Sequence, residues 1–321
     1  MDRFRWVIIL IAVLQLGTSP AHAQSGGFPN KPVRIIVPYG PGGGNDILAR
    51  IVAQKLNEIW QQPVVVDNRG GAGSSLGTGL AAQARPDGYT LTVNGIALST
   101  LPALYPNLPY DIERDLAPIT LLASQPFALI VHPSVPATTP GELIALAKAK
   151  PDQITFGSGG GAAVLATELY RNMTGTKSVH VRYKSGGQAI SEVVGGHVQA
   201  AISPMSLALP YASSGKVKAL AVTAAKRSAL APNLPTLSDS GVAGYEYETW
   251  YGAFAPAGVP RAIFAQLNRD IVRALAAPDL RNRLTGMGME PLSSTPEEFS
   301  RYFKAEIARW GRVIREAGIK P

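Results

Sequence analysis

At 321 residues, with 46% hydrophobic and 16% charged residues, the chain is long enough for one large or two medium domains with proper cores, which excludes a disordered or collagen-like protein. The formal net charge of +8 favours anionic partners, but Lys and Arg are scattered without a run of five or more, which favours anionic solutes over nucleic acid. Cysteine is absent, so disulfides, thiolate metal sites and a lipidated cysteine are excluded.

The N-terminus has the pattern of a secretory signal peptide. Arg3 and Arg5 form a basic region, residues 6–16 are apolar, and Ala21-His22-Ala23 is an A-x-A cleavage site. The apolar run is too short to span a membrane, which needs about 20 residues. We therefore expect residues 1–23 to be removed, leaving a periplasmic protein without a membrane anchor.

After a Gly/Pro linker at 25–32, β-branched runs alternate with segments of helical periodicity. We expect strands at 33–37, 63–67 and 89–94 and helices at 47–60, 76–84 and 100–105. This alternation predicts an α/β fold with a parallel sheet, in which ligands bind at the carboxyl ends of the strands. The loops at 39–46, 69–75 and 94–100 are therefore expected to point the same way.

Two strands, 119–123 and 127–131, are expected next, separated by a break at Gln125-Pro126. A second alternating set has strands at 154–156, 178–181, 199–202 and 217–222 and helices at 141–149, 163–173 and 189–194. A strand at 249–255 and helices at 261–276, 278–287 and 296–316 complete the chain. We predict two lobes, 24–125 plus 250–321 and 126–249, with a ligand cleft between them and two hinge strands, at 125–132 and 250–256.

Two glycine-rich turns are the most informative motifs. PYGPGGGND at 38–46 joins a strand to a helix, and FGSGGG at 156–161 repeats the arrangement in the second set. Consecutive glycines before a helix can present several N–H groups to one anion, although a tightly packed turn is the alternative for either motif alone. Together they predict a clamp for a carboxylate.

The first turn lacks the Lys and hydroxyl of a nucleotide P-loop, and we expect Asp46 to cap the following helix. Replacing Gly43 and Gly44 together by valine is expected to abolish binding without unfolding the protein.

No residues assemble into a catalytic or metal-binding motif. His132, His180 and His197 are isolated in the sequence, and no G-x-S-x-G motif occurs. Arg182 and Lys184 either contact an anion or form a solvated strand end. We expect neither an enzyme nor a metal or other cofactor.

The chain resembles the extracytoplasmic solute receptors of tripartite tricarboxylate transporters, the Bug-type receptors, over nearly all of the sequence after the signal. The matching motifs are KPVRIIVP (31–38), PGG (41–43), PDGYT (86–90), LPYD (108–111), FGS (156–158), YK (183–184), KALAVT (218–223), WYG (250–252), APAG (255–258) and AGIK (317–320). The resemblance implies a two-lobed type II periplasmic binding fold that closes like a Venus flytrap on a small organic carboxylate. It also implies delivery of that ligand to the membrane permease subunits of a tripartite transporter, and we expect the receptor to be a monomer.

The residues predicted to bind the ligand lie in the two turns, at nearby strand ends and at the crossing between the lobes. They are Tyr39, Gly42, Gly43, Gly44, Asn45, Asp46, Asn94, Ser99, Ser158, Gly159, Gly160, Gly161, Ala162, Arg182, Tyr183, Ser203 and Trp250.

Departures from the family pattern bear on specificity. The second turn usually continues as G-S-x-x-H, whereas this chain has alanine at 162, 163 and 166, so the carboxylate is expected to depend more on backbone amides and water. Arg182 replaces a usual proline, and we hypothesise that it supplies a cation for a second anionic group. Ser203 replaces a frequent Asp, which disfavours an amino-acid ligand. A carboxylate-sensing signalling component and an exported enzyme are the alternative functions.

Overall fold

The computed structural model describes residues 27–183, 185–316 and 318–319. The chain divides into two compact units, residues 1–30 and 31–321, and the expected signal peptide at 1–23 lies outside the described residues. Within the described residues, the helices and strands belong to the second unit.

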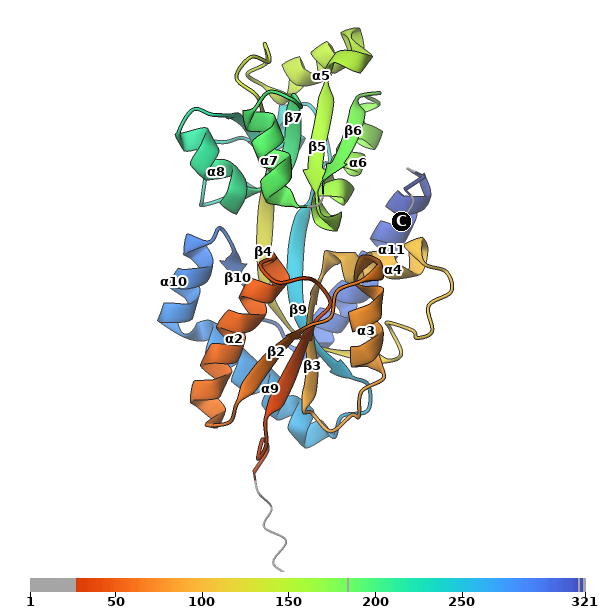
Figure 1. Cartoon of the computed structure of the whole chain (residues 1–321), viewed down its shortest axis with the longest axis vertical. Helices are drawn as coiled ribbons and strands as arrows, with labels where there is room; N and C mark the ends of the chain where they lie inside the picture. The colour runs from red at the N-terminus through yellow and green to blue at the C-terminus, as the bar shows by residue number, and fades with distance from the viewer. Residues whose placement is uncertain (1–26, 184, 317, 320–321) are drawn as a thin grey trace, which may run out of the picture. The chain divides into compact units, whose positions relative to one another are not determined.

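A first group of strands is built around the N-terminal half of the long strand β4 (Figure 1). The strand order is β2-β1-β3-β9-β4, and the short β10 also pairs with β4. The strands are β1 (Val33–Val37), β2 (Val64–Asn68), β3 (Thr90–Gly95), β4 (Leu116–Val131), β9 (Glu248–Pro256) and β10 (Glu290–Pro291). The helices of this group are α2 (Gly44–Trp60), α3 (Ser75–Ala82), α4 (Ile96–Leu104), α9 (Arg261–Ala276), α10 (Pro278–Gly286) and α11 (Pro296–Glu316).

A second group of strands continues from the C-terminal half of β4 in the order β4-β7-β5-β6, with β8 also on β4. Its strands are β5 (Thr155–Gly159), β6 (Val179–Tyr183), β7 (Ala200–Pro204) and β8 (Lys218–Val222). Its helices are α5 (Pro140–Ala149), α6 (Gly161–Thr174), α7 (Gly186–Val194) and α8 (Met205–Ser213). Helix α8 is not evident from the sequence, because Pro204 and Pro210 obscure the pattern of so short a helix.

The predicted break at Gln125-Pro126 is wrong, because β4 runs as one strand through both residues. It pairs with β9 through Pro126, with β7 from Phe127 onward and with β8 from Ala128 onward, so that one strand joins both groups. Pro126 is tolerated because it stands where the β9 ladder ends, opposite Glu248. The sheet is also mixed rather than parallel: β1, β2 and β3 are parallel, but β9 is antiparallel to both β3 and β4.

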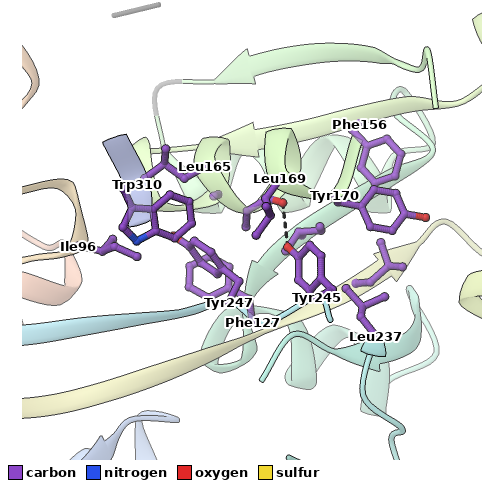
Figure 2. Packing of buried hydrophobic residues seen from close by; sticks show 14 of the residues in the cluster. Ile96, Phe127, Phe156, Leu165, Leu169, Tyr170, Leu237, Tyr245, Tyr247 and Trp310 are labelled. Atoms are coloured by element: carbon purple, nitrogen blue, oxygen red, sulfur yellow. Dashed lines mark hydrogen bonds between the residues drawn. The ribbon is translucent and has the colours of Figure 1, made fainter. Parts of the chain in front are cut away.

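An aromatic core packs around the residues where β4 and β9 meet the second group (Figure 2). The ring of Tyr247 meets Phe127 edge-on with 5.3 Å between centroids and Trp310 with 5.5 Å. Trp310 lies on α11, and its indole N–H donates to the buried carboxylate of Glu306 at 2.9 Å. The indole N–H of Trp250 donates to the same carboxylate at 3.0 Å. Because α11 therefore contacts residues of both strand groups, it steadies the junction that positions the site.

Within the described residues, no helix has the length and apolar character needed to cross a membrane.

Candidate ligand-binding site

A cavity of about 1080 Å³ lies where the glycine-rich turns of the two strand groups face one another. The three loops that the sequence predicts to point the same way all line it. Its lining residues are 38–45, 47, 70–74, 95–97, 159–163, 185–187, 204, 206 and 207, together with Gln125, Phe127, Thr249, Tyr251, Met287 and Met289.

Helix N-termini converge on this cavity. Residues of the first turns of α2, α4, α6, α7 and α8 all line it. Because the first N–H groups of a helix have no intrahelical acceptor and carry the positive end of its dipole, the cavity is an environment for negative charge.

The first glycine turn is held by the carboxylate of Asp46, which is almost fully buried. One oxygen accepts the Gly42 N–H at 2.9 Å, and the other accepts from Arg50 Nε at 3.0 Å and Asn68 Nδ2 at 2.9 Å. Burial opposes ionisation of Asp46, but these hydrogen bonds outweigh it and the pKa of the carboxyl lies below its usual value. Asp46 is expected to cap the helix, but Gly43 occupies the N-cap position. Asp46 is the third residue of α2 and holds the turn from there.

The amides of the first turn remain available to a ligand. The first intrahelical bond of α2 runs from Ile47 N–H to the Gly43 carbonyl at 3.0 Å, so the N–H groups of residues 43–46 precede the helical ladder. Gly43 has extended backbone, and a Cβ there would meet no atom within 4 Å. A Cβ on Gly44 would instead overlap the hydroxyl of buried Tyr251. Valine at Gly44 therefore requires Tyr251 to move, whereas valine at Gly43 does not, and the expectation that the double replacement leaves the fold intact stays a prediction.

The second turn brings two helix starts together. The Val164 N–H bonds the Gly160 carbonyl at 3.2 Å, so the N–H groups of residues 161–163 precede the ladder of α6. Gly160 has φ of +83°, which favours glycine, and a Cβ on Gly159 would overlap the Ser185 carbonyl in front of α7. This close approach places the start of α7 beside that of α6.

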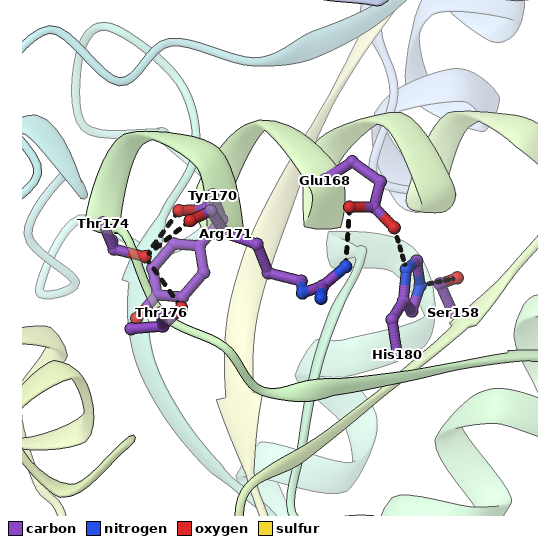
Figure 3. Close-up of polar contacts among 7 residues, drawn as sticks. All are labelled: Ser158, Glu168, Tyr170, Arg171, Thr174, Thr176 and His180. Carbon is purple, nitrogen blue, oxygen red and sulfur yellow. Dashed lines mark hydrogen bonds and ion pairs between the residues drawn. The ribbon is translucent and has the colours of Figure 1, made fainter. Parts of the chain in front are cut away.

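Ser158, which precedes the three glycines of the second turn, is buried and is fixed by a partly buried polar network (Figure 3). Its Oγ lies 2.6 Å from His180 Nε2, and His180 Nδ1 lies 2.6 Å from the carboxylate of Glu168. Arg171 donates to the second oxygen of Glu168 at 2.7 Å. The hydrogen bond from His180, opposed by burial and reinforced by Arg171, lowers the pKa of Glu168. His180 is isolated in the sequence, but β5 and α6 bring its hydrogen-bond partners to it in the fold.

The lining includes nine of the residues predicted to bind the ligand: Tyr39, Gly42, Gly43, Gly44, Asn45, Gly159, Gly160, Gly161 and Ala162. The phenol of Tyr39 donates to Asn94 Oδ1 at 2.9 Å, and burial raises the pKa of Tyr39 to about 12. Tyr39 therefore stays neutral at physiological pH. Asn94 is fully buried and also donates to Thr78, so it fixes the position of the Tyr39 hydroxyl that it accepts from.

The other predicted residues lie outside the lining. Trp250 is buried against α11, Ser203 is buried in β7, and Ser99 donates to the Ile96 carbonyl at 2.6 Å inside α4. Arg182 and Tyr183 end β6 on opposite faces of the strand: Tyr183 packs under Gly157, and Arg182 is exposed. Asp46, Asn94 and Ser158 support the turns as described above.

Several lining residues were not predicted. Ser185-Gly186-Gly187 and Gly70-Gly71-Ala72-Gly73 repeat the glycine-before-helix signal in shorter form, and this signal could have found them. Gln125 and Tyr251 share a hydrogen bond of 3.0 Å, and Gln125 also donates to Ser206 at 2.8 Å. No local sequence signal marks Met287 and Met289, which reach the cavity through tertiary packing.

None of the lining residues that the structure describes is charged. Among the residues that the structure describes, no three His, Cys, Asp or Glu side chains lie close enough together to hold a metal ion. Polar contacts from the described lining would therefore come from backbone amides and from neutral hydroxyl and amide side chains. Tyr251 is one of these side chains, and its burial and the nearby Tyr39 raise its pKa.

Comparison with known proteins identifies relatives along almost the whole chain. Residues 48–319 match the family model described as "Tripartite tricarboxylate transporter family receptor". Protein BugT of Bordetella pertussis is 35% identical over 297 residues, covering 91% of this chain and 91% of BugT.

Two solved structures share the fold. R. palustris Rpa4515 with adipate has a TM-score of 0.82 and 33% identity, covering 92% of this chain and 100% of that chain. MatC from Rhodopseudomonas palustris with bound malate has a TM-score of 0.79 and 30% identity, covering 89% and 100% respectively. These neighbours confirm the predicted two-lobed periplasmic binding fold. The chain therefore belongs to the tripartite tricarboxylate transporter receptor family, whose members are solute-binding proteins.

Proposed function

We propose that this receptor captures a small organic carboxylate between two lobes in the periplasm and delivers it to the membrane permease of a tripartite transporter. The observation that carries the proposal is the convergence of helix N-termini and two glycine turns on a cavity whose described lining has no charged side chain. A carboxylate satisfies several such N–H groups at once, whereas a cation has no described counter-charge there. Rpa4515 with adipate and MatC with malate support a carboxylate as the ligand class.

The proposed lobes are residues 24–125 plus 250–321 and residues 126–249. In support, β4 changes its partners between Pro126 and Phe127, and β9 begins at Glu248. Thr223 bonds Phe127 through both its backbone N–H and its hydroxyl, and the Tyr247 N–H bonds the Thr223 carbonyl at 2.8 Å. We place the hinge at these crossings, where ligand binding would shift the balance between open and closed lobes.

We also propose that the protein is not an enzyme, although Ser158, His180 and Glu168 lie in the order of a hydrolase triad. Ser158 is only 1% exposed and is absent from the cavity lining, so a substrate in the cavity does not meet its hydroxyl. The network instead holds β5, β6 and α6 together beneath the second turn.

A thermal-shift screen of organic acids, followed by calorimetry, tests the function. The protein is first unfolded and refolded to remove solute carried through purification. We expect carboxylates to raise the melting temperature, neutral amides of the same shape to do so far less, and affinity to be about micromolar, near −8 kcal/mol. Stabilisation by neutral solutes alone would contradict a carboxylate receptor, and turnover of a bound acid would favour an enzyme.

A further inference from the structure

Two glutamates, Glu248 and Glu290, which we call the hinge glutamates, lie at the crossing between the two strand groups. Glu248 begins β9 and Glu290 begins β10. Ser124 of β4 pairs with both strands, so β9 and β10 lie along opposite edges of β4. Thr249 and Met289, which are next to the hinge glutamates in the sequence, line the cavity. Because successive residues of a strand face opposite sides, the hinge glutamates face away from the cavity, on the back of the sheet.

The back of the sheet spans the boundary between the proposed lobes. Glu290 belongs to the first proposed lobe, whereas Glu248 and Ser228 belong to the second. The Ser228 hydroxyl donates to Glu290 Oε1 across 3.5 Å. Glu248 stands opposite Pro126, at the last pair of the ladder between β4 and β9. Both lobes therefore contribute groups to this face, directly behind the hinge.

The charged groups that act most strongly on Glu248 are negative. Glu248 is partly buried, and the carboxylates that act on it are Glu290 on β10 and Glu246 in the segment before β9. Burial, reinforced by these two carboxylates, raises the pKa of Glu248 to about 7. Tyr302 on α11 is also close by, and because burial raises the pKa of its phenol it stays neutral. Glu248 can therefore change its charge near neutral pH.

The cations of the neighbouring elements do not neutralise the hinge glutamates. Arg309 on α11 pairs with the buried carboxylate of Glu306 at 3.4 Å. Arg227 and Lys226, in the segment after β8, are exposed, and Arg227 donates to the Pro232 carbonyl at 3.3 Å. Among the residues that the structure describes, neither hinge glutamate takes part in an ion pair. Their mutual repulsion is therefore uncompensated when both are ionised.

Movement of the lobes changes the spacing on this face. Closure over the cavity narrows the cavity face of β4 and β9 and spreads the back face, whereas opening does the reverse. A protonated Glu248 can donate to Glu290 and so hold the back face together. When both hinge glutamates are ionised, spreading of the back face relieves their repulsion and restores their hydration.

Resting on the two-lobed receptor proposed above, we infer that the hinge glutamates make closure of the cleft pH-dependent: protonation holds the cleft open, and ionisation favours closure. Closure on a ligand then releases a proton, so affinity rises with pH although neither glutamate lines the cavity. With its pKa at about 7, Glu248 is about nine-tenths protonated at pH of about 6 and about nine-tenths ionised at pH of about 8. If it is ionised throughout in the closed form, affinity rises by about tenfold over that range.

Small-angle X-ray scattering of the refolded, ligand-free protein tests the switch without any ligand. We expect a smaller radius of gyration at pH of about 8 than at pH of about 6, because ionisation favours the closed lobes. Glu248→Gln keeps the shape of the side chain but cannot ionise, so it should have the larger radius at both pH values. The matched control is Glu297→Gln, which removes an exposed carboxylate in the first turn of α11 and should respond as the wild type does. An equal wild-type radius at both pH values, or a wild-type response in Glu248→Gln, would overturn the inference while leaving the carboxylate receptor intact.

Calorimetry with the most strongly stabilising acid of the thermal-shift screen measures the effect on binding. A carboxylic acid with a pKa of about 4–5 is ionised at both pH values, so its own titration does not contribute. We expect its affinity to be about tenfold higher at the higher pH in the wild type and in Glu297→Gln, and nearly equal at the two pH values in Glu248→Gln. Wild-type affinities that agree within about twofold would contradict the inference. Failure of every acid to bind would instead overturn the proposed function itself.

Discussion

Replacement of Gly43 by valine separates binding from folding at the first turn. Gly43 lines the cavity, its backbone is extended, and an added Cβ would meet no atom within 4 Å. A branched side chain there is therefore accommodated by the protein but occupies the space in front of the free amides of α2. Since glycine is a fair residue at a helix N-cap and valine a poor one, we expect the free energy of unfolding to fall by no more than about 1 kcal/mol.

Binding should respond much more strongly. A hydrogen bond to a charged group contributes about 1.5–3 kcal/mol, so keeping a carboxylate away from two amides costs about 3 kcal/mol or more, or over a hundredfold in affinity. Calorimetry with the best carboxylate of the screen measures this loss, and chemical denaturation measures stability.

Two variants complete the comparison. Gly141→Val makes the same change in the exposed first turn of α5, where an added Cβ also meets no atom within 4 Å, and should alter neither quantity appreciably. Gly44→Val forces its side chain into buried Tyr251 and should destabilise the fold by about 1–3 kcal/mol. Wild-type affinity in a folded Gly43→Val protein would refute the assignment of these amides to the ligand.

Three further variants test the supports of the site. Asp46→Ala should lower the free energy of unfolding by about 2 kcal/mol at neutral pH. Because the pKa of Asp46 is depressed in the folded state, the greater stability of the wild type should disappear as the pH falls through that pKa. A difference in denaturation midpoints that stays constant with pH would contradict this. His180→Phe should cost about 2 kcal/mol and weaken ligand binding, whereas His197→Phe at an exposed pair should do neither; equal effects of the two would exclude a special role for the buried network. Burial, with two neighbouring glutamates, raises the pKa of Glu248 to about 7, so the folded state retains a proton that the unfolded chain releases above pH of about 4.5. Wild-type stability relative to Glu248→Gln should therefore fall by roughly 2 kcal/mol from pH ~4.5 to ~7, and parallel melting curves across that range would argue against it.

The sequence predicts most elements well because their patterns are local. Helices α9 and α11 begin and end where their amphipathic periodicity indicates, and β1 matches its run of β-branched residues. β4 is the exception, since a proline inside an apolar run indicates a break. Pro126 is compatible with one continuous strand only because the ladder to β9 ends there, which is a property of the partner strand.

Some parts of the candidate site can also be predicted from the sequence, whereas others cannot. The glycine turns are visible in the sequence because each combines a strand end, glycines and a helix start within nine residues or fewer. The contributions of Met287 and Met289 to the cavity and the partners of His180 are not visible, because they depend on residues that only tertiary packing brings together. Gly288 reaches Ser206, and Glu168 and Ser158 approach His180 from separate elements. Trp250 lies outside the cavity although Thr249 and Tyr251 line it, because neighbouring strand positions face opposite sides.

The most direct test of the central claim is a crystal structure of the refolded protein with its most strongly stabilising carboxylate. The account predicts the carboxylate oxygens within hydrogen-bond distance, directly or through one water, of N–H groups in residues 43–46 and 161–163 together. A carboxylate bound to side-chain cations away from both glycine turns would contradict it.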